Sequence, residues 1–140
     1  NGMPGLPPNV KAGPVPHEEF VRQMAGAAAV VVPIQQGLHR AAGQQTYLNA
    51  MLLGKPTIAN RVYGVADHIR DGETGLIVDG STEGYVTALH RVLDPARREA
   101  TARMAAAGQR AVQEHHLFEH HAACLLRHFD EMLQEASIQE

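Results

Sequence analysis

The valine run AAVVVP, at residues 28–33, constrains the fold of this chain most strongly. Three consecutive valines with no polar alternation, followed by a proline, are typical of a strand buried on both faces of a parallel sheet. Two further short apolar runs follow, PTIAN at 56–60 and GLIVD at 75–79, each next to turn-forming residues. Lys11 to Val15 is a candidate for one more strand. The sequence therefore predicts three or four short strands.

Helical patterns separate and follow these strands. Residues 18–28 place apolar side chains at helical spacing, with acidic residues in the first turn. A second helix is expected over about 44–53, because Gly54 suits a helix C-cap and Pro56 prevents continuation. Beyond Ser81, a suitable N-cap, the chain is expected to be wholly helical. The expected helices cover about 82–93, 96–114 and 117–135.

Strands that alternate with helices predict right-handed crossovers and a parallel sheet covered on both faces. The fold class is therefore α/β, a partial doubly wound, Rossmann-like sheet with a helical C-terminal tail. Residues 1–140 form one domain, divided into an α/β part at 1–81 and a tail at 82–140. Because such sheets usually have more strands, we expect the others to precede Asn1 and the chain to be a piece of a longer protein.

Composition excludes several classes of protein. The 140 residues are 44% hydrophobic and 19% charged, as in folded soluble proteins. A formal charge of -3 with interspersed signs lacks the basic patch of a nucleic-acid binder. Cys124 is the only cysteine, so no intramolecular disulfide forms and a reducing cytoplasm is the simplest location. No apolar window is long enough to span a membrane, which leaves peripheral membrane contact open.

The helix expected after the valine strand begins near GQQT, residues 43–46. The backbone N–H groups of Gly43, Gln44, Gln45 and Thr46 would have no partner within that helix. Such amides and the positive end of the helix suit a phosphate, and ligands of parallel sheets bind where strands end and helices begin. Every helix has an N-terminus, so a plain buried helix remains the alternative on this local pattern.

The order of motifs adds a resemblance to a known family. The chain reads NV-x-x-G-x-V, a helix, A-x-V-V-V-P, a loop, L-x-A-M-x-x-G-K-P, and then GVADHIRDGETGLIV. This order, over residues 8–80, resembles the C-terminal half of GT-B fold glycosyltransferases of the group 1, or family 4, class. LNAMLLGKPTIA and VADHIRDGETGLIV are its most specific segments. The resemblance implies two facing Rossmann-like domains, of which the C-terminal one holds most of a nucleotide-sugar donor.

The resemblance also implies roles for individual residues. The phosphate-binding amides of the family fall on Gly43 to Thr46. The family has two glutamates separated by seven residues, and the second, which holds the ribose hydroxyls, falls on Asn49. An amide still donates and accepts hydrogen bonds but lacks the charge that strengthens them. The first glutamate falls on Ala41, so His39 and Arg40 are the candidates to face the transferred sugar. No catalytic residue is assigned.

Further parts of the site are implied less directly. The loop from Pro14 to His17, with Val15, corresponds to backbone that lies along the nucleotide base; a plain loop before a helix is the alternative. Gly64 and Asp67 match a turn that forms the floor of the site, or a solvated turn. Basic residues that neutralise the diphosphate, and the acceptor domain, belong to an earlier segment. Neither a cofactor nor a metal is expected, because this family stabilises the diphosphate with helix N-termini and side chains.

The histidine-rich stretch HHLFEHH, at residues 115–121, is a candidate zinc site. His116 and His120 are four residues apart and would share one face of a helix, as zinc ligands do. No third ligand is forced onto that face, and a helix break is expected in the stretch. A solvated or partly packed surface is the preferred interpretation.

The leading functional hypothesis is a glycosyltransferase that moves a sugar from a nucleoside diphosphate to an acceptor in glycan or envelope polysaccharide synthesis. This chain is expected to bind the nucleoside-diphosphate part of the donor without transferring the sugar alone. The competing hypothesis is a non-catalytic, degenerate half-domain that binds a nucleotide or a protein partner. Ala41 and Asn49 are the positions on which the two hypotheses differ most.

Overall fold

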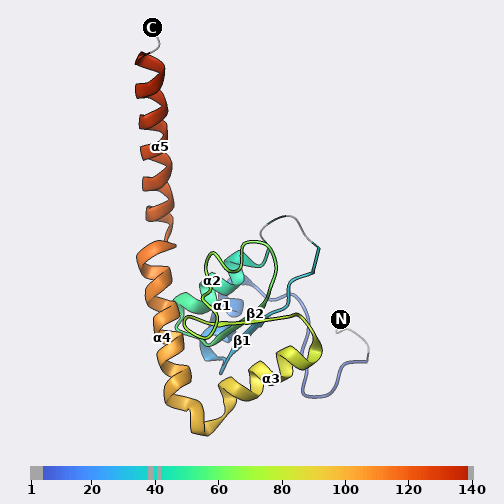
Figure 1. Cartoon of the computed structure of the whole chain (residues 1–140). Coiled ribbons are helices and arrows are strands. Elements are labelled where there is room, and N and C mark those ends of the chain that lie inside the picture. The colour runs from blue at the N-terminus through green and yellow to red at the C-terminus, as the bar shows by residue number, and fades with distance from the viewer. Residues whose placement is uncertain (1–4, 38–39, 41, 139–140) are drawn as a thin grey trace.

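The computed structural model describes residues 5–37, 40 and 42–138, and its elements are labelled in Figure 1. Three parallel strands in the order β1-β2-β3 form a sheet with helices around it, which confirms the predicted fold class. In chain order the elements are α1 (His17–Gly26), β1 (Val30–Val32), α2 (Gln44–Leu52), β2 (Thr57–Asn60), β3 (Leu76–Val78), α3 (Thr82–Leu93), the 3-10 helix η1 (Pro95–Arg97), α4 (Arg98–His115) and α5 (Phe118–Ile138).

The sheet is buried on both faces. Val31, Ile58 and Leu76 pair across the three strands, and with the adjoining helices α3 and α4 they build one hydrophobic cluster. The next residue along each strand faces the opposite side, where α2 and the C-terminal part of α4 complete a second cluster. The continuous valine pattern arises because β1 contributes valine side chains to the cluster on each face of the sheet.

The prediction of a strand from Lys11 to Val15 is wrong. These residues are exposed and belong to no strand of the structure. Pro14 and Pro16 lack the N–H group that a sheet ladder requires, and no described strand lies beside this segment. The segment therefore leads as irregular chain into α1.

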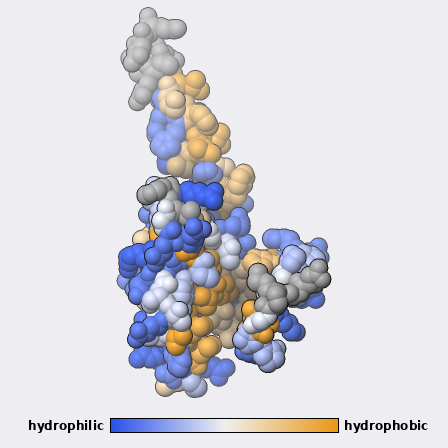
Figure 2. Space-filling model, turned by 90° about the vertical axis from the view of Figure 1, so that its right-hand side faces the viewer, coloured by the Kyte–Doolittle hydropathy of each residue, from blue (hydrophilic) through white to orange (hydrophobic). Residues whose placement is uncertain are grey.

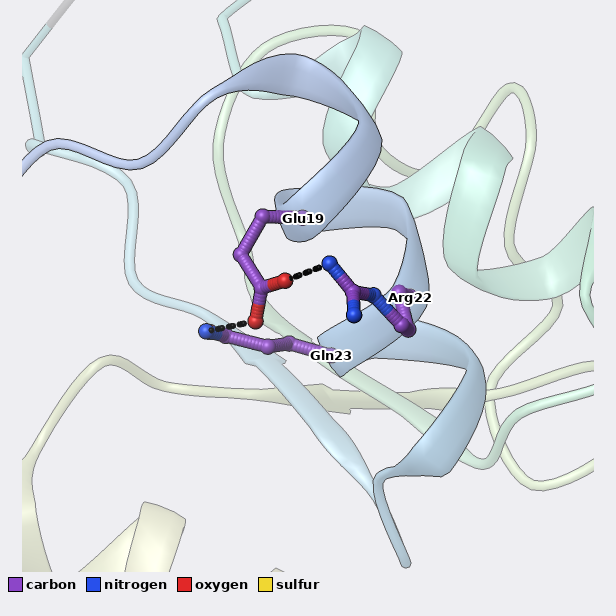
Figure 3. A network of polar contacts seen from close by, with 3 residues as sticks. All are labelled: Glu19, Arg22 and Gln23. Carbon is purple, nitrogen blue, oxygen red and sulfur yellow. Dashed lines mark hydrogen bonds and ion pairs between the residues drawn. The ribbon is translucent and has the colours of Figure 1, made fainter.

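Helix α1 has one polar and one buried side. The carboxylate of Glu19 accepts hydrogen bonds from the Arg22 guanidinium and, at 2.8 Å, from the side-chain amide of Gln23 (Figure 3). These exposed contacts span one helical turn, so each adds only a few tenths of a kcal/mol. Met24 is buried. The amphipathic pattern predicted for residues 18–28 therefore corresponds to a real helix.

The C-terminal end of α2 is closed as the sequence predicts. Gly54 has a φ of 67° and donates its N–H to the Met51 carbonyl at 2.8 Å, while Lys55 donates to Ala50 at 3.0 Å. This pair of bonds is a Schellman motif, in which the left-handed residue is usually glycine. The side chain of Gln109 on α4 donates to the Leu52 carbonyl at 2.8 Å. The end of α2 is thus tied both to its own cap and to α4.

Helix α4 approaches the turn before β3 through Gly108. A Cβ atom added to Gly108 would lie 2.4 Å from the carbonyl oxygen of Thr74. The carbonyl belongs to the backbone, so it cannot move aside as a flexible side chain would. Gly108 therefore allows α4 to pack closely against this turn.

Helix α5 continues beyond α4 and away from the sheet (Figure 1). The expected helix break is present, since α4 ends at His115 and α5 begins at Phe118. The predicted apolar stripe is on this helix and is exposed, as the orange side chains of the projecting helix show in Figure 2. Its large exposed members are Phe118, Leu125, Leu126, Phe129, Met132 and Leu133. Among the described helices, none has the length and apolar character needed to cross a membrane.

Candidate functional site

Helix α2 begins at Gln44, after the loop that follows β1, at the carboxyl edge of the sheet. Its N-cap is Gly43, which has a φ of 69° and offers no side chain to cap the helix. A Cβ atom at Gly43 would lie 3.0 Å from Ile34 and 3.1 Å from Val32. Backbone geometry and close packing together require glycine at the entry to α2.

The first amides of α2 match the prediction only in part. The Thr46 N–H donates to the Gly43 carbonyl at 3.0 Å, so the prediction that Thr46 offers a free backbone amide is wrong. This bond arises because the first turn is tightened to 3-10 geometry. Among the described residues, the amides of Gly43, Gln44 and Gln45 have no acceptor. Three amides, rather than four, remain available at this end of the helix.

Gln45 and Asn49 lie one turn apart on the same side of α2. The side-chain amide of Gln45 donates to Oδ1 of Asn49 at 3.1 Å. Gln45 is exposed and Asn49 is half-buried. The Nδ2 group of Asn49 therefore remains a donor next to the first turn, as a residue that binds a diol requires.

Gly43→Ala is expected to lower the free energy of unfolding by about 2–3 kcal/mol, through left-handed strain and crowding against Ile34 and Val32. Gly37→Ala is the matched control, because Gly37 has a φ of 78° and no atom within 4 Å of its added Cβ. That control should cost only about 1 kcal/mol, from strain alone. Urea denaturation of both variants measures the difference. Equal losses would show that the packing contact at Gly43 does not contribute.

A buried asparagine joins the loops at this edge, and the sequence prediction missed it. Asn60, at the end of β2, is 1% exposed. Its Oδ1 accepts from the Ile34 amide at 2.7 Å, and its Nδ2 donates to the Ile34 carbonyl at 2.8 Å. Tyr85 of α3 donates its hydroxyl to the same Oδ1 at 3.0 Å. A polar residue at the carboxyl end of a predicted buried strand was the signal that could have identified it.

The start of α3 lies at the same edge, but a carboxylate is already hydrogen-bonded there. Ser81 is the N-cap, as predicted, and its Oγ accepts from the Gly84 amide at 3.0 Å. The amide and hydroxyl of Ser81 both donate to the Asp79 carboxylate, at 2.9 and 2.7 Å. These bonds hold the pKa of Asp79 below its ordinary value. An anion at the start of α3 would be repelled by this carboxylate, so the first turn of α2 is the better place for one.

The turn at residues 64–68 lies against the first turn of α2. The Gly64 carbonyl is 2.8 Å from Nδ1 of His68, whose other ring nitrogen is 2.9 Å from the side-chain amide of Gln44. Burial, and then the charge of Asp67, raises the pKa of Tyr47 above its ordinary value. Gly64 thus reaches the first turn of α2 only through His68, and Asp67 is exposed, so their role as the floor of the site stays a prediction. His68 is a further residue that the sequence prediction missed.

Comparison with known proteins identifies the family. A family described as glycosyl transferases group 1 matches residues 5–95 of the chain. The chain belongs to the group 1 glycosyltransferases.

Individual relatives agree with this assignment. A D-inositol 3-phosphate glycosyltransferase from Acidothermus cellulolyticus is 35% identical over 97 residues, which are 69% of this chain and 21% of that protein. A protein of the same name from Rhodococcus opacus is 46% identical over 57 residues, which are 39% of this chain and 13% of that protein. The chain thus spans about a fifth of the length of the first of these relatives.

A solved structure is similar in fold. The sucrose-phosphate synthase of Thermosynechococcus elongatus superposes with a TM-score of 0.69 at 24% identity, over 89% of this chain and 30% of that protein. At this identity the likeness concerns the fold alone. It covers most of the chain, so the arrangement of the sheet and helices described above also occurs in that synthase.

The remaining residues predicted for this group 1 glycosyltransferase are not all brought to α2. Val15 and His17 are exposed at the start of α1, and within the described residues neither forms a hydrogen bond to α2. Arg40 is exposed in the bend before α2. His39 and Ala41 lie outside the described residues. The structure therefore groups Gly43, Gln44, Gln45 and Asn49, and leaves the sugar-facing and base-facing predictions untested.

Proposed function

We propose that the complete protein is a glycosyltransferase and that this chain binds the nucleoside-diphosphate part of its sugar donor at the first turn of α2. The amides of Gly43, Gln44 and Gln45 would receive the phosphates, and Asn49 would hold the ribose. His39 and Arg40 remain the candidates to face the sugar, and Val15 and His17 the candidates to lie along the base. The side chain of Thr46 adds a hydroxyl donor at this turn.

One observation carries the proposal. In a chain that belongs to the group 1 glycosyltransferases, α2 begins with three amides that have no acceptor among the described residues. Gly43, the N-cap, has no side chain that could accept hydrogen bonds from these amides. Free amides at the positive end of a helix favour a phosphate, because the hydrogen bonds and the helix dipole act on the same charge.

Calorimetric titration of the complete protein with UDP and with GDP tests this site. Gln45→Ala and Asn49→Ala are each expected to lower the affinity for the preferred nucleotide about five- to tenfold. This is the effect of losing one or two hydrogen bonds. Gln113→Ala, an exposed glutamine on α4, is the matched control and should leave affinity unchanged. Unchanged affinity in both site variants would remove the proposed site.

The non-catalytic alternative is supported by the replacement of two family glutamates by Ala41 and Asn49. Binding and turnover separate the two proposals. We expect the complete protein to release sugar slowly from its preferred donor in water, and faster when the acceptor is supplied. Nucleotide binding without any turnover across UDP and GDP sugars would favour the non-catalytic half-domain instead.

The rest of the enzyme follows from the same proposal. The acceptor would be bound by a further Rossmann-like domain, and the reaction would take place in the cytoplasm, at or near a membrane surface, in glycan or envelope polysaccharide synthesis. The curated relatives support only the coarser statement that a larger protein surrounds this fold, since the matched region is 21% of the Acidothermus protein.

A further inference from the structure

His68 lies between two parts of the structure that are distant in sequence. Its half-buried ring follows β2 in the turn at 64–68 and contacts the first turn of α2 on one side. On the other side its ring centroid is 4.8 Å from that of His116, the C-cap of α4. The ring of Tyr47, one turn along α2, is 5.7 Å away. His68 therefore fills the space between the start of α2 and the junction of α4 with α5.

The hydrogen bonds of His68 determine which ring nitrogen carries the proton. Nδ1 is 2.8 Å from the Gly64 carbonyl oxygen, which can only accept, so Nδ1 must donate. In the neutral ring Nε2 is then an acceptor, and the side-chain amide of Gln44 donates to it at 2.9 Å. The Tyr47 hydroxyl, 3.2 Å from Nδ1, shares the same proton as a second acceptor. One tautomer satisfies all three contacts.

Gln44 is the first residue of α2, where its backbone amide is among those without an acceptor. A glutamine side chain on a helix end has three rotatable bonds, and ordering it costs about 1–2 kcal/mol of conformational entropy. The bond to His68 holds the carboxamide with one N–H toward the ring and the second N–H still available. We propose that His68 is a positioning residue that fixes the Gln44 side chain for donor phosphate. This role rests on the proposed donor site.

The surroundings keep the His68 ring in place. Burial, and then repulsion from His68, His115 and His120, lowers the pKa of His116, so this ring stays neutral near pH 7 and packs as an uncharged aromatic. Burial is the larger cause, and the charge of the adjacent Asp67 the smaller cause, of the raised pKa of Tyr47. The Tyr47 hydroxyl therefore also stays uncharged. The His68 ring thus meets uncharged rings on both sides.

A double-mutant cycle on the complete protein tests the role. His68→Phe keeps an aromatic ring but removes both nitrogens. It should lower the affinity for UDP or GDP about fivefold, which is the effect of losing one neutral hydrogen bond. In the Gln44→Leu background, His68→Phe should have no further effect, because the residue through which it acts is gone. His68→Gln, whose side-chain oxygen can accept from Gln44, should restore most of the affinity.

Ligand-free NMR gives an independent readout. The Gln44 side-chain amide protons should be dispersed and slowly exchanging in the wild type and in His68→Gln, and should move to the position of solvated glutamine in His68→Phe. Circular dichroism confirms that each variant is folded. The inference is overturned if His68→Phe lowers nucleotide affinity equally in the wild-type and Gln44→Leu backgrounds, or if His68→Gln fails to restore binding. Either result would show that the histidine is merely structural.

The two proposals fail differently. If nucleotide affinity responds to Gln45→Ala and Asn49→Ala but not to His68→Phe, the donor site stands and the positioning role is wrong. If the wild type binds neither nucleotide, the proposed function fails and the positioning role fails with it. In that case the amide resonance still reports whether the Gln44 to His68 bond exists.

Discussion

Asn60→Ala is expected to lower the free energy of unfolding by about 3 kcal/mol, which is among the larger losses expected from one substitution. The alanine would leave both the amide and the carbonyl of Ile34 without the partners they have at 2.7 and 2.8 Å. Both groups are buried, so water does not replace the lost bonds freely, and each unpaired group costs about 1–3 kcal/mol. Urea denaturation followed by circular dichroism measures the loss.

Tyr85→Phe is the matched control for Asn60. It removes only the 3.0 Å bond from the Tyr85 hydroxyl to Oδ1 of Asn60 and leaves both bonds to Ile34. Burial, and then Asp79, raises the pKa of Tyr85, so its hydroxyl remains a donor at neutral pH. The control should cost about 1 kcal/mol. If the two variants were equally stable, the backbone of Ile34 would not depend on Asn60.

Gly108→Ala is expected to lower the free energy of unfolding by about 2–3 kcal/mol, although alanine ordinarily favours a helix over glycine. The new Cβ would lie 2.4 Å from the Thr74 carbonyl oxygen, far inside normal contact. Either α4 or the turn before β3 must move, and both pack against the buried clusters. The melting temperature and the urea midpoint should therefore both fall.

Gly26→Ala provides the comparison for Gly108. Gly26 also lies in a helix, at the end of α1, and a Cβ atom there would meet nothing within 4 Å. Its substitution should change stability by no more than about 0.5 kcal/mol. If Gly108→Ala were as stable as Gly26→Ala, then α4 could shift away from Thr74 without loss of packing.

Local signals in the sequence were sufficient for most of the fold. The valine run predicted β1, Gly54 and Pro56 predicted the end of α2, and Ser81 predicted the cap of α3, because each residue acts on its own neighbours. The prediction of a strand from Lys11 to Val15 was wrong because strand formation does not depend on neighbours in sequence alone. A strand needs a neighbouring strand with which to pair, and no local pattern supplies that partner.

The candidate site was predictable only where its members are close in sequence. Gln45 and Asn49 share a helix, so a spacing of four residues is enough to bring them to one side of α2. Asn60 bonds to a residue 26 positions away, and His68 to one 24 positions away, so only the folded chain brings them together. The free amide predicted at Thr46 was lost to a tight first turn, a detail that depends on the geometry of Gly43 rather than on residue type.

Helix α2 is held at both ends, by Gly43 against Ile34 and Val32 and by Gln109 at the carbonyl of Leu52. A ligand that bound its first turn would meet donors already in position, so little binding free energy would be spent on ordering the protein. Association would then be governed by diffusional encounter rather than by a slow rearrangement of the helix. Differences in affinity between nucleotides would accordingly appear mainly in their dissociation rates.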